Sequence, residues 1–291
     1  MSILNSIKSW IQEPPPAYVF EISEAGLAWA ATVPFATGFA PFHRPAVVVT
    51  PLKDNVVDEV LLRQSVEGVL NPALKRKTCA LVLPDFCGRV MVLDFDTFPS
   101  KLEEQQALVK FRVKRSVPYD IDSAAVSFAV QSTEGKHQEV VAAVVSLEII
   151  ARYEAPFRAA GLHPGVVTTS SVATLDLLRE PGVTMAARLS GRQLTLSVIE
   201  AGRLKLVRCV ELPRVDREEV EGVVVPTLAY IEDELKKKPD HLVVCGFGSM
   251  TESWNWSSEF GLTAEPLRSR LGAPGEQNAG LYGFLERLEV A

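Results

Sequence analysis

The sequence predicts an α/β protein whose architecture is repeated within one chain. Two segments, residues 17–84 and 184–248, each contain three short apolar stretches, then a stretch with helical periodicity, then a buried strand. Short apolar runs between turn residues are typical of strands, and apolar residues spaced three and four apart are typical of helices. The same order of elements in both segments indicates an internal duplication.

The first repeated segment contains the strand-like runs AYVFEI, LAWAAT and PAVVVT. They cover residues 17–22, 27–32 and 45–50. A helix is expected within residues 55–70, where valines and leucines recur at helical spacing. The run TCALVLP, residues 78–84, has the continuous apolar character of a buried strand. The predicted order is therefore three strands, a helix and a strand.

A different pattern separates the two repeated segments. From residue 89, the sequence predicts a strand, a helix with Ser100 as its N-cap, and two further strands around a turn at residues 134–136. A second helix follows, closes at Gly161 and contains Pro156, which should kink it. We therefore expect an inserted unit with the order strand, helix, strand, strand.

The second repeated segment begins with three strands within residues 184–212. Turns between them are expected at residues 190–191 and 201–202. A helix whose charges run from acidic to basic follows over residues 217–238, and Pro226 should interrupt it. The apolar run HLVVCGFG then predicts a closing strand.

Composition excludes several classes of function. The formal net charge of −6 and the isoelectric point near 5.4 disfavour broad contact with nucleic acid, which needs many Lys and Arg side chains. The four cysteines form no Cys-x-x-Cys pair and the four histidines are scattered, so we expect buried free thiols and no zinc site. Because we find neither a signal-peptide pattern nor a run of 18 apolar residues, we expect a cytoplasmic protein.

The first 16 residues predict an amphipathic helix that ends at three consecutive prolines. The apolar residues Ile3, Leu4, Ile7, Trp10 and Ile11 share one helical face. This helix either folds back on its own domain or contacts a membrane surface or a partner protein. The scarcity of Lys and Arg on its polar face weakens the membrane alternative.

Three stretches carry a resemblance to a known family. Residues 81–130 contain a strand, a Leu-Pro pair and a helix before Pro118-Tyr119; residues 140–178 contain a helix that ends in Ala-Gly-Leu; and residues 245–288 contain a Gly-rich turn and a closing helix. In this order they resemble the actin-like ATPase superfamily, and within it the PilM family of type IV pilus assembly proteins, which is related to the FtsA family. The resemblance implies a duplicated actin-like (ribonuclease H-like) α/β fold.

The resemblance also implies a division into subdomains. Residues 1–16 would form the helix and linker, residues 17–88 with 164–183 a subdomain 1A, residues 89–163 the inserted subdomain 1C, and residues 184–291 the second half. The fourth subdomain of the fold would be much reduced, because the stretch between Arg208 and His241 has room for little more than one helix.

Members of the superfamily hold Mg²⁺ and phosphates with two Asp-x-Gly turns, one in each half. Carboxylate oxygens suit the metal, and glycine lets backbone N–H groups approach the phosphates. Here the first turn has Glu21 and Ser23, and the second has Arg188 and Ser190. A guanidinium cannot ligate a metal. The site therefore binds nucleotide without metal or does not bind nucleotide.

The matching adenosine turn is only partly kept. Gly246 and Gly248 are present, but Phe247 adds bulk between them, and such a turn also serves as a plain connection between elements. We therefore expect all three turns to be non-functional remnants. No catalytic residue, metal ligand or cofactor is assigned, and ATP remains the alternative ligand.

The resemblance implies a non-enzymatic cytoplasmic scaffold at the inner membrane. Such a scaffold would grip the short cytoplasmic tail of a PilN-like bitopic membrane protein near residues 89–163 and couple the platform to pilus motor ATPases. Membrane contact would be indirect or through the N-terminal helix. The alternatives are an ATP-binding switch or ATPase of the superfamily, and the cytoplasmic domain of a type II secretion platform protein. An ATPase would need carboxylates at the phosphates, whereas Asp94, Asp96, Asp120 and Asp122 all lie in the insert.

Overall fold

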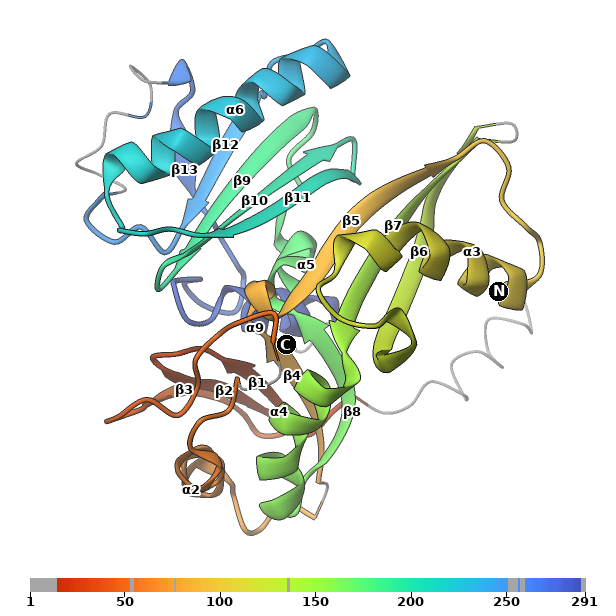
Figure 1. The fold of residues 1–291 in the computed structure, drawn as a ribbon. Helices are drawn as coiled ribbons and strands as arrows, with labels where there is room; N and C mark the ends of the chain where they lie inside the picture. The colour runs from red at the N-terminus through yellow and green to blue at the C-terminus, as the bar shows by residue number, and fades with distance from the viewer. Residues whose placement is uncertain are drawn as a thin grey trace, which may run out of the picture.

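The computed structural model describes residues 15–52, 55–75, 77–134, 137–250, 256 and 260–288. The amphipathic helix expected at the N-terminus lies outside these residues. Two five-stranded sheets and one three-stranded sheet make up the framework (Figure 1). No helix in the described ranges is both long and apolar enough to cross a membrane.

The first sheet has the strand order β3-β2-β1-β4-β8. The bounds are Tyr18–Ile22 (β1), Gly26–Thr32 (β2), Phe35–Pro41 (β3), Thr78–Leu83 (β4) and His163–Thr169 (β8). β1 to β3 are antiparallel neighbours, whereas β4 runs parallel to both β1 and β8. Two helices, α2 (Glu59–Val69) and α4 (Leu147–Ala159), pack on one face of this sheet.

The prediction of a third strand at residues 45–50 was wrong, because β3 lies earlier in the chain. Val47 and Val49 are buried, yet Val47 forms only an isolated bridge to Val56. Their apolar character therefore reflects burial against the core and not membership of a sheet. β3 is an edge strand whose Phe35 and Phe39 are exposed, so it lacks the apolar signal of a buried strand.

The second sheet repeats the first, with the order β11-β10-β9-β12-β13. Its strands are Val183–Ser190 (β9), Gln193–Glu200 (β10), Arg203–Glu211 (β11), His241–Cys245 (β12) and Ala264–Pro266 (β13). One helix, α6 (Arg217–Leu235), covers it in Figure 1. The predicted duplication is confirmed, since both halves have three antiparallel strands, a helix and a parallel strand. β13 was not predicted.

Pro226 does not interrupt α6, contrary to the prediction. The helix runs from Arg217 to Leu235 with Pro226 near its middle. A proline removes the hydrogen bond to the carbonyl four residues earlier, here that of Gly222. Both residues are exposed, so water can hydrogen-bond to the free carbonyl.

The insert forms the three-stranded sheet β5-β7-β6. Its elements are Gly88–Phe95 (β5), Leu102–Val113 (α3), Lys114–Ser116 (η2), Ile121–Ser123 (η3), Ala124–Glu134 (β6) and His137–Ser146 (β7). Ser100 is not the N-cap of α3: the cap is Lys101, and no side chain caps the helix. The Gln105 side chain instead donates to the Pro99 carbonyl at 2.7 Å and closes this turn.

The insert also reaches the second half of the protein. The amide side chain of Gln131 on β6 both donates to the backbone carbonyl of Leu204 and accepts from its N–H, at 2.6 and 2.9 Å. Lys205 lies 2.5 Å from Glu139 of β7, and both side chains are mostly buried. The edge strand β11 is therefore held against the insert.

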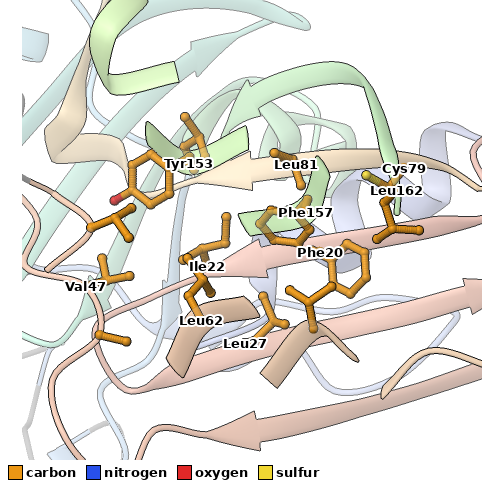
Figure 2. Packing of buried hydrophobic residues seen from close by; sticks show 14 of the residues in the cluster. Phe20, Ile22, Leu27, Val47, Leu62, Cys79, Leu81, Tyr153, Phe157 and Leu162 are labelled. Carbon is orange, nitrogen blue, oxygen red and sulfur yellow. The ribbon is translucent and has the colours of Figure 1, made fainter. Parts of the chain in front are cut away.

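Helix α4 belongs with the first sheet, although the expected boundary at residue 163 assigns it to the insert. Ile149, Tyr153 and Phe157 are fully buried in the cluster that contains Phe20 and Leu81 of the sheet (Figure 2). The burial of one apolar face decides where this helix packs. The insert therefore ends with β7, at Ser146.

The opposite face of the first sheet packs on the last helix of the chain. This core contains Val19 and Val82 of the sheet and residues of α5 (Ser170–Thr174), η4 (Leu175–Leu177) and α9 (Ala279–Arg287). A Cβ at Gly283 would lie 2.1 Å from the Ala173 carbonyl oxygen. The glycine lets α9 lie directly against α5, which brings the N-terminus of α9 to the boundary between the halves.

The substitution Phe157→Ala should lower the free energy of unfolding by about 3–5 kcal/mol. The Phe157 ring is fully buried, and its centroid lies 5.0 Å from that of Phe20. Leu147→Ala on the same helix is the control: Leu147 is 51% exposed, so its loss should change stability by less than about 0.5 kcal/mol. Equal, small effects in urea unfolding would contradict the packing of α4 on the first sheet.

Candidate functional site

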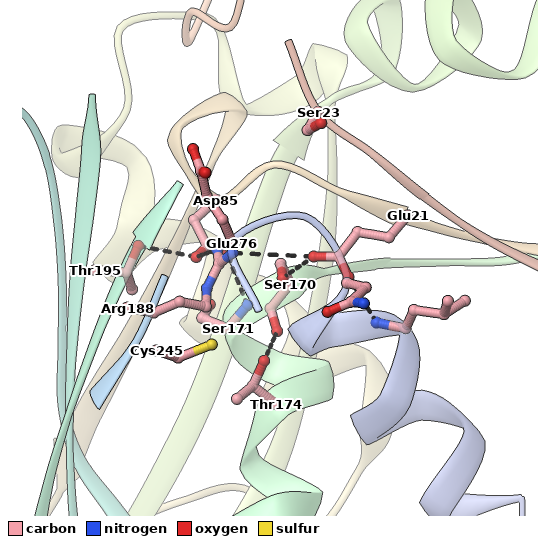
Figure 3. Close-up of polar contacts among 12 residues, drawn as sticks. Glu21, Ser23, Asp85, Ser170, Ser171, Thr174, Arg188, Thr195, Cys245 and Glu276 are labelled. Atoms are coloured by element: carbon pink, nitrogen blue, oxygen red, sulfur yellow. Dashed lines mark hydrogen bonds and ion pairs between the residues drawn. The ribbon is translucent and has the colours of Figure 1, made fainter. Parts of the chain in front are cut away.

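The two turns singled out in the sequence face each other where the halves meet. Glu21 lies in β1 and Arg188 in the corresponding strand β9, and both side chains are buried, with 3% and 8% exposure. Ser23 and Ser190 line one cavity just beyond them. The structure thus brings the four predicted residues of the two phosphate turns to one place, and Figure 3 shows Glu21, Ser23 and Arg188 there.

Arg188 forms an ion pair with Asp85, a residue that sequence reasoning missed. Asp85 opens the short helix η1 (Asp85–Cys87) directly after β4, and its Oδ2 lies 2.5 Å from Nη2 of Arg188. The same carboxylate accepts hydrogen bonds from the Ser171 N–H at 2.6 Å and from the Thr195 hydroxyl at 2.9 Å. Because Arg188 and Thr195 belong to the second sheet, this cluster joins the two halves.

Glu21 completes the cluster from the first sheet. Its Oε2 accepts from the Leu281 N–H at the start of α9, at 2.7 Å, and its Oε1 accepts from the Ser170 hydroxyl. Nη1 of Arg188 lies 3.9 Å from the same Oε1. We call Glu21, Asp85 and Arg188, with the groups that hydrogen-bond to them, the interdomain ion cluster.

Burial and charge act in opposite directions on these groups. Burial raises the pKa of the Glu21 carboxyl, and Arg188 and the hydrogen bonds from Ser170 and Leu281 only partly offset that effect. Burial alone would lower the pKa of Arg188, but the neighbouring Asp85 and Glu21 raise it overall. Arg188 is therefore a permanent cation in this cluster.

Asp85 carried a signal that the sequence analysis did not use. It follows Pro84 at the end of a buried parallel strand, and residues at the carboxyl ends of such strands meet at one edge of a sheet. The four aspartates that were considered lie elsewhere. Asp94 lies in the insert sheet, where its largely exposed side chain is 3.3 Å from the half-buried His137.

A cavity of about 280 Å³ lies outside the ion cluster, between the two turns. Ser23 hydrogen-bonds within its own turn, to the N–H and carbonyl of Gly26. The N–H of Gly191, the residue after Ser190, donates to Glu276 at 2.8 Å. Glu24 also lines the cavity, whereas no Lys or Arg does so among the described residues.

Backbone geometry accounts for the glycines of the expected adenosine turn. Gly246 has φ +83°, and a Cβ there would lie 1.9 Å from the Leu189 carbonyl oxygen. Phe247 is 2% exposed, and its ring packs edge-on against Trp256 at 5.2 Å. Phe247 is therefore a core residue. Gly248 also has a left-handed conformation, with φ +53°.

The remaining candidate groups offer little chemistry. Burial raises the pKa of the Cys79, Cys209 and Cys245 thiols to about 12 and that of Cys87 still further, so none is an activated nucleophile. In the ranges that the structure describes, His, Cys, Asp and Glu residues form no group of three or more that could hold a metal ion.

Comparison with solved structures defines the class of fold. A protein from Bacteroides thetaiotaomicron with an actin-like ATPase fold and unknown function is similar over 92% of this chain and 96% of its own, with 11% identity and a TM-score of 0.53. The chain therefore has the actin-like ATPase fold, as predicted. No family model and no curated protein matches the sequence.

A second solved structure is more similar in shape. It is the PilM–PilN type IV pilus biogenesis complex, which matches over 95% of this chain and 99% of the compared chain, with 18% identity and a TM-score of 0.74. At this level of identity the likeness shows the fold: the chain resembles, over nearly its whole length, the chain matched in that complex.

The substitution Arg188→Met should destabilise the protein by about 3–5 kcal/mol at pH 7, because it leaves two buried carboxylates without their cation. Without the cation, the pKa of Glu21 rises further, so the folded state takes up protons more readily. The deficit should therefore shrink as the pH falls from 7 towards 4.5, the ordinary pKa of this carboxyl.

Arg192→Met is the matched control in the adjacent turn. Arg192 pairs with Glu211 at the surface, where both side chains are about half exposed, so its loss should cost less than about 1 kcal/mol at any pH. Urea unfolding of both variants at pH 7 and pH 5 provides the comparison. A deficit for Arg188→Met that is small, or that grows as the pH falls, would contradict the assigned roles of these groups.

Proposed function

We propose that this protein is a non-enzymatic scaffold of an inner-membrane assembly platform, of the type IV pilus or a related machine, with a degenerate nucleotide site. The observation that carries the proposal is the position of Arg188. By the resemblance to the actin-like superfamily, Arg188 stands where the second turn of an ATPase has a metal-binding carboxylate, and its guanidinium pairs with Asp85 and Glu21 of the first half.

Electrostatics around the two turns oppose nucleotide binding. The cavity between the turns is lined by the carboxylates of Glu24 and Glu276 and, within the described ranges, by no cationic side chain, which leaves its lining with a formal balance of −2. A polyphosphate brought into this cleft would be repelled. Glu21, Glu24, Asp85 and Glu276 each accept a hydrogen bond from the protein itself, which competes with ligation of Mg²⁺.

An apolar groove elsewhere suits a peptide. A cavity of about 120 Å³ lies between the insert and the first sheet. Its lining comes from β6 and β7 on one side and from β4, β8 and two helices on the other: Leu83, Ala125, Ser127, Ala143, Val145, Ile150, Val167, Thr168, Thr169 and Val172. β8 and β6 are each the last strand of their sheets. We name this cavity the insert groove.

The insert groove has the features of a site for an extended peptide. An edge strand offers unpaired backbone groups, and apolar lining receives alternate side chains of an added strand. The PilM–PilN complex, similar in fold, unites two proteins of type IV pilus biogenesis. By analogy, the occupant is the cytoplasmic tail of a PilN-like membrane protein, which would hold this chain at the inner membrane and link it to pilus motor ATPases.

The substitution Ser127→Trp should abolish binding of the PilN-like cytoplasmic tail or weaken it at least ten-fold. Ser127 is an exposed residue of β6 that lines the groove, so the indole fills the cavity without disturbing the core. The probe is a fluorescently labelled synthetic peptide with the cytoplasmic tail sequence of the PilN-like protein from the same organism, titrated by fluorescence anisotropy.

Ala129→Trp is the control, because Ala129 is exposed on the same strand, two residues further along, but does not line the groove. It should bind the peptide as the unmodified protein does. Equal affinity for both variants would place the peptide outside the groove. An absence of peptide binding to the unmodified protein would contradict the proposed partner.

A further inference from the structure

A second charged cavity lies at the end of α9, away from the turns and from the insert groove. Its volume is about 270 Å³, and its lining comes from η4 and the loop after it, from the loop after β13, and from α9: Leu177, Arg179, Arg268, Ser269, Arg270 and Glu286. Three of these six residues are arginines. We name this cavity the arginine pocket.

Glu286 holds two of the arginines in place. This carboxylate is 5% exposed and accepts hydrogen bonds from the Arg270 N–H at 2.7 Å and the Ser269 hydroxyl at 3.0 Å. Its other oxygen accepts from Nε of Arg270 at 3.1 Å and from Nη2 of Arg179 at 3.5 Å. These bonds hold the pKa of Glu286 below its ordinary value despite burial, so the anchor stays charged.

Arg179 and Arg270 keep guanidinium nitrogens that do not contact Glu286. Arg270 is held through Nε to Glu286, and Arg179 through Nε to the Asp176 carbonyl, at 3.0 Å. Within the described part of the chain, neither the terminal nitrogens of Arg270 nor any nitrogen of Arg268 has a hydrogen-bond or ion-pair partner. The guanidinium side chains of Arg179 and Arg270 are 64% and 67% exposed. Their forks are therefore oriented and still accessible.

The side chains that line the pocket have a positive formal balance. The three lining arginines against Glu286 leave +2. Asp176 and Arg287, which interact with each other beside the pocket, add one charge of each sign and leave the balance at +2. An oriented guanidinium matches two oxygens of an oxyanion at once, and its side-chain entropy is already partly lost.

We propose that the arginine pocket binds the phosphoryl group of a phosphate ester. The ester comes either from a lipid headgroup or from a soluble phosphorylated metabolite, and both present the same oxygens to Arg268 and Arg270. The cavity extends beyond the guanidinium groups to Leu177, which gives room and an apolar contact for the carbon part of the ester. This site does not depend on the scaffold role, so either can fail without the other.

Two titrations of the full chain test the site. In one, glycerol 3-phosphate is added and binding is followed by ³¹P NMR, with inorganic phosphate as a second probe. In the other, the protein is sedimented with phosphatidylcholine vesicles that contain or lack phosphatidylglycerol. We expect Arg268→Gln to weaken binding about ten-fold in whichever of the two titrations shows binding to the unmodified protein. Since the side chain of Arg268 is exposed and has no partner among the residues that the structure describes, the fold should be unaffected.

Arg214→Gln is the control, because Arg214 is also an exposed arginine, at 68%, but it pairs with Asp216 and does not line the pocket. If glycerol 3-phosphate binds saturably and only Arg268→Gln weakens this binding, the ligand is a soluble metabolite. If the same result is seen with phosphatidylglycerol vesicles, the ligand is a lipid. An absence of binding in both arms, or equal binding by both variants, would overturn the proposal. Displacement by polyglutamate but not by phosphate would overturn it in favour of an acidic peptide.

Discussion

The rest of the structure depends on one buried interaction, the ion pair between Arg188 and Asp85. It joins strand β9 of the second half to the end of β4 in the first, and Glu21 and the N–H of Leu281 extend it to β1 and α9. A buried guanidinium is tolerated only with such partners, because its desolvation must be offset by opposite charge and hydrogen bonds. The interdomain ion cluster therefore holds β1, β4, β9 and α9 together at the boundary between the halves.

The duplication explains why these residues meet at all. Glu21 and Arg188 occupy corresponding positions, near the ends of the first strand of each sheet, and the fold places those ends face to face. Two carboxylates at such positions would leave a gap for a cation and its ligand. A carboxylate and a guanidinium attract each other directly, so the same geometry yields a bond between the halves.

The sequence analysis captured what is local and missed what depends on distant contacts. Apolar periodicity was enough to predict the duplicated order of elements and the insert. The residues at the expected phosphate turns pointed to Glu21 and Arg188. Asp85 was missed because its partner Arg188 lies 103 residues away, so no spacing reveals the pair. The third strand was misplaced because the apolar residues of PAVVVT are buried without belonging to a sheet. The edge strand FATGFAP is largely exposed and therefore lacks a clear apolar pattern. Whether α4 packs on the first sheet or on the insert likewise depends on contacts between residues far apart in the sequence.

Calorimetric titration of the purified protein with ATP, with and without Mg²⁺, tests most directly whether the interdomain ion cluster replaces a nucleotide. We predict no binding tighter than about 1 mM, which corresponds to about −4 kcal/mol, in either condition. Micromolar binding that requires Mg²⁺ would contradict the account, because it would mean that Arg188 leaves the cluster or that Glu21 and Asp85 hold a metal beside it.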